Sequence, residues 1–277
     1  MAVLTLLALV AFAANSLLAR AAIGPGEDGS AAIGAVAFTA LRLAAGALVL
    51  WPWYRHARAR NGLRRGANGA LWLVAYALPF AVAYVWLGAA TGALLLFGAV
   101  QLTMLLAGRR AGERLGARGG AGVLIALIGV GVLLGPGVSA PPLVPALAML
   151  VAGVAWGVYS LAGRGEVAPV HASARNFVWA SPAALALAAW PGAWDGVTGY
   201  GIALAATSGA LTSGLGYVVW YLALPWLTRT TAAVVQLAVP VVAAFGAIAF
   251  LGEALDARLV LASLLVLGGV GAALLRR

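Results

Sequence analysis

The sequence has no cysteine among its 277 residues. This absence excludes a disulfide framework, a thiolate nucleophile and any metal site built on cysteine. The two histidines, His56 and His171, lie in basic connecting stretches away from any cluster of carboxylates. We therefore expect neither a metal ion nor another cofactor.

Acidic residues are nearly as scarce, because Asp and Glu together number 7 and charged residues make up only 9% of the chain. The seven carboxylates all lie at or beyond the ends of apolar runs: Glu27, Asp28, Glu113, Glu166, Asp195, Glu253 and Asp256. No phosphate-binding loop is present. An enzyme needs convergent acid, base or nucleophile groups, so we do not expect catalysis. Proton-coupled carriers usually hold an acid or a histidine inside the membrane, and its lack favours uncoupled facilitated transport or exchange.

Apolar residues dominate the chain, at 64% of all positions, with a mean hydropathy of +1.03. Soluble domains are nearer 45–50% apolar. Ten apolar runs are each about as long as a bilayer core is thick: 2–20, 34–53, 69–88, 91–108, 119–135, 143–162, 173–190, 200–223, 230–251 and 259–275. The runs are continuous rather than alternating, which argues against barrel strands. The sequence thus predicts an all-α polytopic membrane protein with ten transmembrane helices, in contact with a lipid bilayer.

The basic residues indicate how the chain crosses the membrane. Fourteen of the 17 lie in the connections that follow every second span, or at the C-terminus, on one side of a ten-span arrangement. Cytoplasmic connections carry such an excess. We therefore expect a multi-pass protein of the inner (plasma) membrane with both termini in the cytoplasm, and we assign the net charge of +10 to topology, with no nucleic-acid partner.

The chain also resembles itself at a distance of about half its length. GERLGAR at 112–118 matches GEALDAR at 252–258, and the stretch 15–20 matches 159–164. The predicted units are 1–138 and 139–277, with five spans each. Because five is odd, the second unit must be inverted relative to the first, an arrangement typical of secondary transporters whose substrate site lies near the midplane.

Arg42 is the one basic residue well inside a span. A charge at the bilayer centre costs about 2.5–3.5 kcal/mol on insertion scales, so Arg42 must face a polar cavity or a partner. One interpretation is that it attracts a substrate carboxylate. The other is that it binds backbone carbonyls or pairs across helices.

Aromatic and polar side chains inside the spans are the remaining candidates for substrate contact. The aromatic candidates are Tyr84, Trp86, Tyr217, Trp220 and Tyr221, which either line a cavity or belong to the interfacial belt. Trp51, Trp53, Trp190, Trp194 and Trp226 stand at span ends and are predicted to be belt residues. The polar candidates are Asn15, Gln101, Tyr159 and Gln236, for which the alternative is hydrogen bonding between helices. Pro79 and Pro240 are candidate hinges.

The stretch 214–255 joins an aromatic-rich span, a short turn, a span with a central proline and a Gly-Glu pair. This order, with Gly216-Tyr217, Pro240 and Gly252-Glu253, resembles the EamA type of the drug/metabolite transporter superfamily. At the position equivalent to Pro240, the first unit has Val100. The resemblance implies ten helices, inverted repeats, a central cavity and export of small metabolites. The length and the aromatic-rich third and eighth spans look most like the YddG type of aromatic amino-acid exporter.

These observations together predict a transporter that exports amino acids, including aromatic and other neutral ones, by alternating access. We expect the transporter to be a monomer. Efflux of drugs or lipophilic cations is an alternative, disfavoured because no embedded carboxylate would meet a cation. A flippase-like lipid transporter is a further alternative.

Overall fold

The computed structural model describes residues 2–26, 29–57, 63–110, 112, 117–135, 140–164, 166, 168–227 and 229–274. Glu27, Asp28, Glu113 and most of the GERLGAR stretch lie outside these residues. The first half contains α1 (Ala2–Ile23), α2 (Ala35–Ala57), α3 (Leu63–Tyr84), α4 (Ala89–Arg110) and α5 (Ala117–Leu134). The second half contains α6 (Leu143–Gly163), α7 (Pro169–Ala188), α8 (Gly199–Thr207), the π-helix η1 (Ser208–Leu215), α9 (Gly216–Ala223), the 3-10 turn η2 (Leu224–Trp226), α10 (Arg229–Gln236), α11 (Ala238–Leu251) and α12 (Ala257–Leu274).

Within the described residues these elements form ten rods and no strand, as the sequence predicts. The segment α8–η1–α9–η2 forms one continuous rod over 199–226, and α10 with α11 forms another. Five of the described helices are long and apolar enough to cross a membrane, and several shorter ones are also apolar. The protein is therefore a multi-pass membrane protein.

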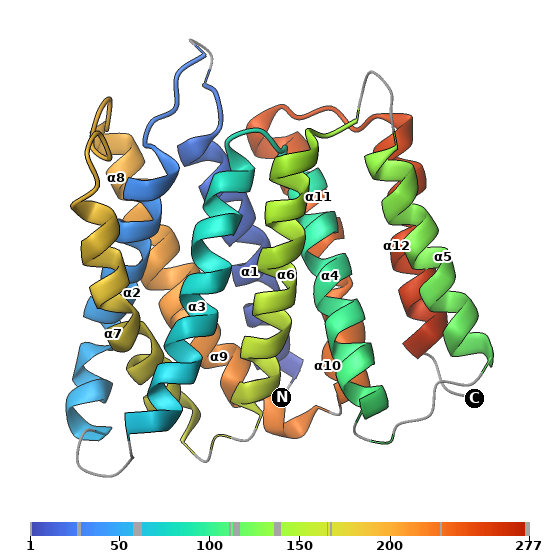
Figure 1. The fold of residues 1–277 in the computed structure, drawn as a ribbon, viewed down its shortest axis with the longest axis horizontal. Coiled ribbons are helices and arrows are strands. Elements are labelled where there is room, and N and C mark those ends of the chain that lie inside the picture. The colour runs from blue at the N-terminus through green and yellow to red at the C-terminus, as the bar shows by residue number, and fades with distance from the viewer. Residues whose placement is uncertain are drawn as a thin grey trace.

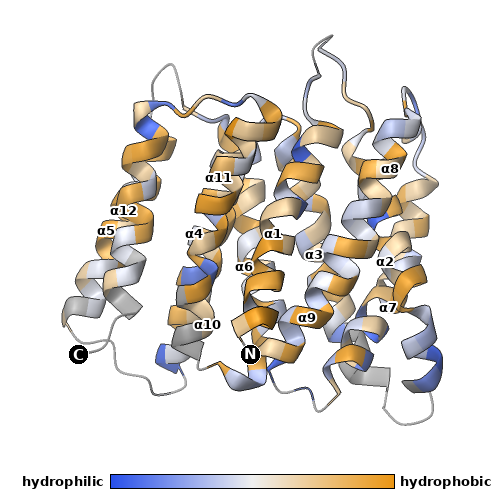
Figure 2. Ribbon diagram, turned by 180° about the vertical axis from the view of Figure 1, so that it is seen from behind, coloured by the Kyte–Doolittle hydropathy of each residue, from blue (hydrophilic) through white to orange (hydrophobic). Residues whose placement is uncertain are grey.

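The rods stand side by side, with the N- and C-termini at the same end of the bundle (Figure 1). Hydrophobic residues cover the middle of most helices, whereas hydrophilic residues concentrate at several helix ends (Figure 2). Arg55 and His56 end α2, and Arg109 and Arg110 end α4, all at the end that carries the termini. This distribution agrees with helices that cross an apolar layer.

The helices α1 and α6 lie in the middle of the bundle. The helix α6 packs on α3 and α4, and α1 packs on α11 and on the α8–η1–α9 rod. Two other pairs flank them, α2 with α7 and α5 with α12 (Figure 1). The last pair packs closely because Gly269 has no side chain, and a Cβ there would lie 2.6 Å from the Ala126 nitrogen.

Two irregularities interrupt the second half. The π-helix η1 lies against α2, and a Cβ at Gly209 would lie only 2.2 Å from the carbonyl oxygen of Arg42. The break between α10 and α11 falls at Leu237. Pro240 explains this break, because it cannot donate the helical hydrogen bond to the carbonyl of Gln236. Pro79, by contrast, lies inside an unbroken α3, and the hinge role of both prolines stays a prediction.

Candidate functional site

Arg42 lies in the interior of the bundle on α2 and is only 1% exposed. Its Nε donates to the hydroxyl of Ser213 over 2.8 Å, and its Nη2 donates to the hydroxyls of Tyr76 and Tyr217 over 3.0 and 2.7 Å. The guanidinium carbon also lies 5.1 Å and 4.8 Å from the ring centroids of Tyr76 and Phe80, within cation–π range. All of these contacts of the Arg42 guanidinium are with uncharged side chains.

The charge of Arg42 has no counter-charge among the described residues, where the two ion pairs are Arg20–Glu253 and Arg175–Glu166. Its Nη1 is buried and makes no hydrogen bond. A buried charged donor without an acceptor is costly, since desolvation is not compensated. Such a group is suited to receive an anionic partner.

Asn15 on α1 connects the same centre to η1. Its Nδ2 donates to the hydroxyl of Tyr76 over 3.1 Å, and its Oδ1 accepts from Ser208 over 2.8 Å and from Thr212 over 3.2 Å. The network thus joins α1, α2 and α3 of the first half to the consecutive elements η1 and α9 of the second half. The π geometry of η1 presents Ser208, Thr212 and Ser213 together to α1 and α2, in keeping with the frequent occurrence of π segments at functional sites.

Aromatic rings form the wall next to this polar centre. The indole of Trp156 on α6 lies 4.5 Å from the Tyr217 ring, 5.2 Å from the Tyr76 ring and 5.1 Å from the Phe12 ring, between centroids. The enclosed cavity measures only about 10 Å³, room for about one water molecule. Its lining residues are Phe12, Asn15, Ser16, Tyr76, Leu96, Phe97, Trp156 and Tyr217. We call this space the central chamber.

An aromatic column extends from the chamber in both directions. Towards the end opposite the termini, Phe80 contacts Tyr76 at 5.2 Å and Tyr84 at 4.8 Å. Towards the end that carries the termini, Tyr159 contacts Tyr217 at 6.1 Å and Tyr221 at 5.2 Å. Aromatic side chains therefore flank the chamber towards both ends of the bundle.

The structure brings most of the sequence-predicted residues to this column. Asn15 and Tyr217 line the chamber, and Arg42 donates to the Tyr217 hydroxyl, while Tyr84, Tyr159 and Tyr221 are buried along the column. Trp220 is also buried, contacts Phe12 at 5.5 Å between ring centroids, and donates from Nε1 to Ser160 over 3.3 Å.

Three predicted residues lie elsewhere. Trp86 follows the end of α3 and is 57% exposed, so it does not contribute to the chamber. Gln101 on α4 donates to the carbonyl of Ala233 over 2.6 Å, which ties α4 to α10. Gln236 accepts from Trp156 Nε1 over 3.3 Å, which ties α10 to α6. Both amides therefore match the alternative of hydrogen bonding between helices.

Sequence reasoning did not select Phe12, Tyr76 or Trp156, although all three line the chamber. A signal for them exists in the internal repeat. Phe12 and Trp156 are 144 positions apart, the same offset that relates 15–20 to 159–164. Tyr76 and Tyr217 are 141 apart and accept from the same Arg42 nitrogen.

The described residues thus form a bundle of apolar helices around a small buried chamber, which is polar on one side and aromatic on the other. Residues 143–275 match the model of the EamA-like transporter family, which supports a membrane transporter of small molecules. It is 54% identical over 270 residues to the uncharacterized protein PA1977 of Pseudomonas aeruginosa, and the alignment covers 96% of this chain and 92% of that relative. A crystal structure of another protein superposes with a TM-score of 0.65 at 22% identity, over 98% of this chain and 95% of the other, and this likeness supports the fold alone.

Proposed function

We propose that the protein exports amino acids, including aromatic and other neutral ones, across the inner membrane by alternating access through the central chamber. The observation that carries this proposal is the juxtaposition of Arg42, a cation without a counter-charge, with the aromatic wall around Trp156. A carboxylate suits the cation, and an apolar or aromatic side chain suits the wall.

The packing supports two inverted repeats, 1–138 and 139–277. An inverted pair of five-span units requires each contact between two spans to recur between their counterparts. The contact of α3 with α6 has its counterpart in that of α1 with the α8–η1–α9 rod, and the contact of α4 with α6 has its counterpart in that of α1 with α11. The pairs α2–α7 and α5–α12 each relate a span to its own counterpart. A transporter of this kind opens by moving one repeat against the other.

The distribution of charge supports a cytoplasmic location for both termini. The described arginines at the ends of α2 and α4 share the end of the bundle that carries the termini. A basic excess is typical of the cytoplasmic side. We infer that the protein works as a monomer without a coupling ion, because the chamber lies within one chain and its described lining residues include no carboxylate.

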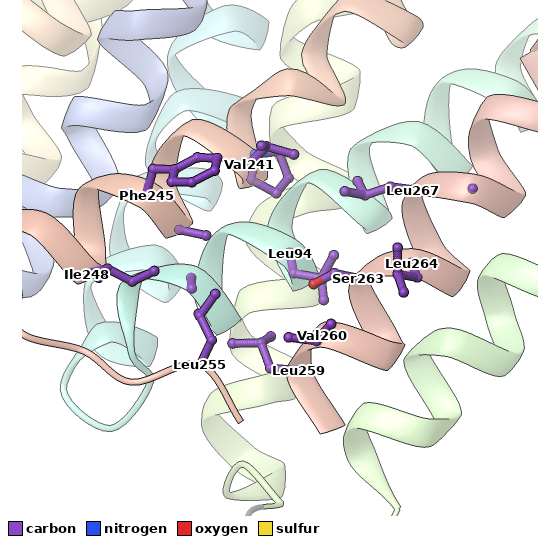
Figure 3. Close-up of a pocket in the computed structure, with 14 residues that line it drawn as sticks. Leu94, Val241, Phe245, Ile248, Leu255, Leu259, Val260, Ser263, Leu264 and Leu267 are labelled. Atoms are coloured by element: carbon purple, nitrogen blue, oxygen red, sulfur yellow. The ribbon is translucent and has the colours of Figure 1, made fainter. Parts of the chain in front are cut away.

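A flippase-like role is a second candidate, favoured by one observation. An apolar groove of about 490 Å³ lies between α4, α11 and α12 (Figure 3). Its labelled side chains include Leu94, Phe245 and Leu264, with the hydroxyl of Ser263 among them. An acyl chain would fit such a surface, whereas efflux of a cation is disfavoured by the positive charge of Arg42.

Purified protein in proteoliposomes tests these candidates. Labelled phenylalanine, threonine, a quaternary cation and a fluorescent phospholipid are offered separately, with and without a proton gradient. We expect the two amino acids to cross and their flux to survive collapse of the gradient. Transport of the cation or of the lipid alone would overturn the proposal, and loss of flux with the gradient would overturn the uncoupled mechanism.

A variant pair links flux to the chamber. Trp156→Ala should reduce phenylalanine flux at least tenfold because it removes the ring that contacts Phe12, Tyr76 and Tyr217. Trp226→Ala, at a side chain that is 73% exposed, serves as the matched control. Equal flux in the two variants would show that transport does not depend on the Trp156 side chain in the chamber.

A further inference from the structure

We propose that the central chamber selects its solute by a carboxylate and an apolar tail, and that an α-amino group is not needed. The substrate class is then monocarboxylates with an apolar or aromatic tail, of which neutral amino acids are one group. This inference rests on the proposed function in taking the chamber as the place where the solute binds.

The hydroxyls of Tyr76 and Tyr217 carry the first observation. The hydroxyl of Tyr76 accepts from Arg42 and from Asn15, and the hydroxyl of Tyr217 accepts from Arg42. The Tyr217 hydroxyl is also hydrogen-bonded to the Tyr76 hydroxyl. Since each phenol has a single proton, this contact uses one of the two, and the pair keeps one donor that the adjacent guanidinium polarises.

The position of these hydroxyls is the second observation. Tyr76 and Tyr217 line the central chamber, and their ring centroids lie 5.2 Å and 4.5 Å from that of Trp156 and 6.4 Å from each other. Arg42 stands behind both hydroxyls and keeps Nη1 without a partner. The remaining hydroxyl donor, backed by one buried cation, forms a site for an oxyanion, since hydrogen bonds to ionised groups are about twice as strong as neutral ones.

The third observation is that the described lining of the chamber has no carboxylate side chain. Its described lining contains no Asp or Glu, and Glu253 and Glu166 are engaged with Arg20 and Arg175. An ammonium group in the chamber would thus meet the field of Arg42 without a compensating carboxylate. The amino group of a bound amino acid would find no ion-pair partner in the described lining, so its removal should not weaken binding.

Three ligands on one phenyl scaffold test the inference in the full-length purified protein by isothermal titration calorimetry. Phenylalanine carries both charged groups, 3-phenylpropionate only the carboxylate, and phenethylamine only the amine. We expect 3-phenylpropionate to bind at least as tightly as phenylalanine, and phenethylamine to bind at least tenfold more weakly than either. Equal affinity for phenethylamine and 3-phenylpropionate would overturn the inference.

Conservative variants identify the groups responsible. Tyr76→Phe and Tyr217→Phe keep the rings and remove the hydroxyls, so each should weaken 3-phenylpropionate about tenfold or more. Tyr200→Phe, on the exposed side of α8, is the matched control. Arg42→Lys should retain more affinity than Arg42→Gln. Unchanged affinity in both tyrosine variants would contradict the assignment.

The two proposals fail separately. If phenylalanine does not cross membranes but 3-phenylpropionate binds with the expected sensitivity to Tyr217→Phe, amino-acid export fails and carboxylate selection stands. If phenylalanine crosses and the tyrosine variants leave its affinity unchanged, amino-acid export stands and carboxylate selection fails.

Discussion

At the scale of single residues, the close approach of η1 to α2 depends on the absence of a side chain at Gly209. A Cβ at Gly209 would lie 2.2 Å from the carbonyl oxygen of Arg42 and 2.8 Å from its Cα. Both are backbone atoms, which cannot move aside as a flexible side chain can. The glycine therefore sets the distance between Arg42 and its partner Ser213 on η1.

Gly209→Ala should separate these two elements. We expect a loss of about 1–3 kcal/mol of stability from overpacking, together with at least tenfold lower flux because Arg42 shifts from its partners. Thermal unfolding in detergent and vesicle uptake measure the two effects. The control is Gly131→Ala, where a Cβ meets nothing within 4 Å and alanine favours the helix. Similar losses in both variants would show that the position has no special role.

Sequence reasoning reached the polar residues of the chamber more readily than its aromatic ones. A charge or an amide inside an apolar run must face a partner, which singles out Arg42 and Asn15. A tryptophan is compatible with lipid, interface or cavity, so depth along the span does not decide its direction. Trp86 therefore looked like Trp220 in the sequence, yet Trp86 is exposed and Trp220 is buried.

At the scale of elements, an ion pair joins the two halves at the end opposite the termini. Arg20 at the end of α1 donates from Nε to Glu253, which follows α11, over 3.2 Å. Glu253 also accepts from the backbone nitrogen of Ala89 at the start of α4, and Arg20 donates to the carbonyl of Tyr84. Gly252 in a left-handed conformation turns the chain so that Glu253 reaches these groups.

This ion pair should stabilise the protein measurably because both side chains are mostly buried, at 19% and 18% exposed. We expect Arg20→Gln and Glu253→Gln each to cost about 1–3 kcal/mol, with a coupling energy of about 1 kcal/mol or more in the double variant. Unfolding of the four proteins in a graded denaturant gives the coupling. Strictly additive effects would mean that the two side chains act independently.

The sequence was a good guide to the elements and a poorer one to their irregularities. Uninterrupted apolar length predicts where the rods lie, and the predicted spans agree with the described rods within a few residues except at the start of α3, which begins at Leu63. The π geometry of η1 was not predicted, because its small and hydroxyl-bearing residues are equally compatible with an α-helix. It forms where α1 and α2 supply partners for Ser208 and Ser213.

At the scale of the whole molecule, the inverted-repeat proposal has a consequence for sidedness. The matched stretches GERLGAR and GEALDAR would face opposite compartments. Arg110 ends α4 beside the first stretch, and Ala254 lies within the second, and both are exposed. Because the chain has no cysteine, a single introduced thiol reports on one site without background.

Labelling with a membrane-impermeant maleimide tests this sidedness. In intact cells we expect Ala254→Cys to react from outside and Arg110→Cys to react only after the membrane is opened. The reason is the basic excess at the end that carries the termini. Reaction of both thiols from the same side would contradict the inverted arrangement and the orientation together.

The π-helix η1 also sets the rotational phase of everything that follows it in the same rod. An α-helix turns by about 100° per residue, so one residue accommodated in a wider turn offsets the aromatic stripe of α9 by about that angle. The Tyr217 hydroxyl, in the first turn after η1, accepts from Arg42. Relaxation of η1 to regular α geometry would therefore turn the Tyr217 ring away from the guanidinium.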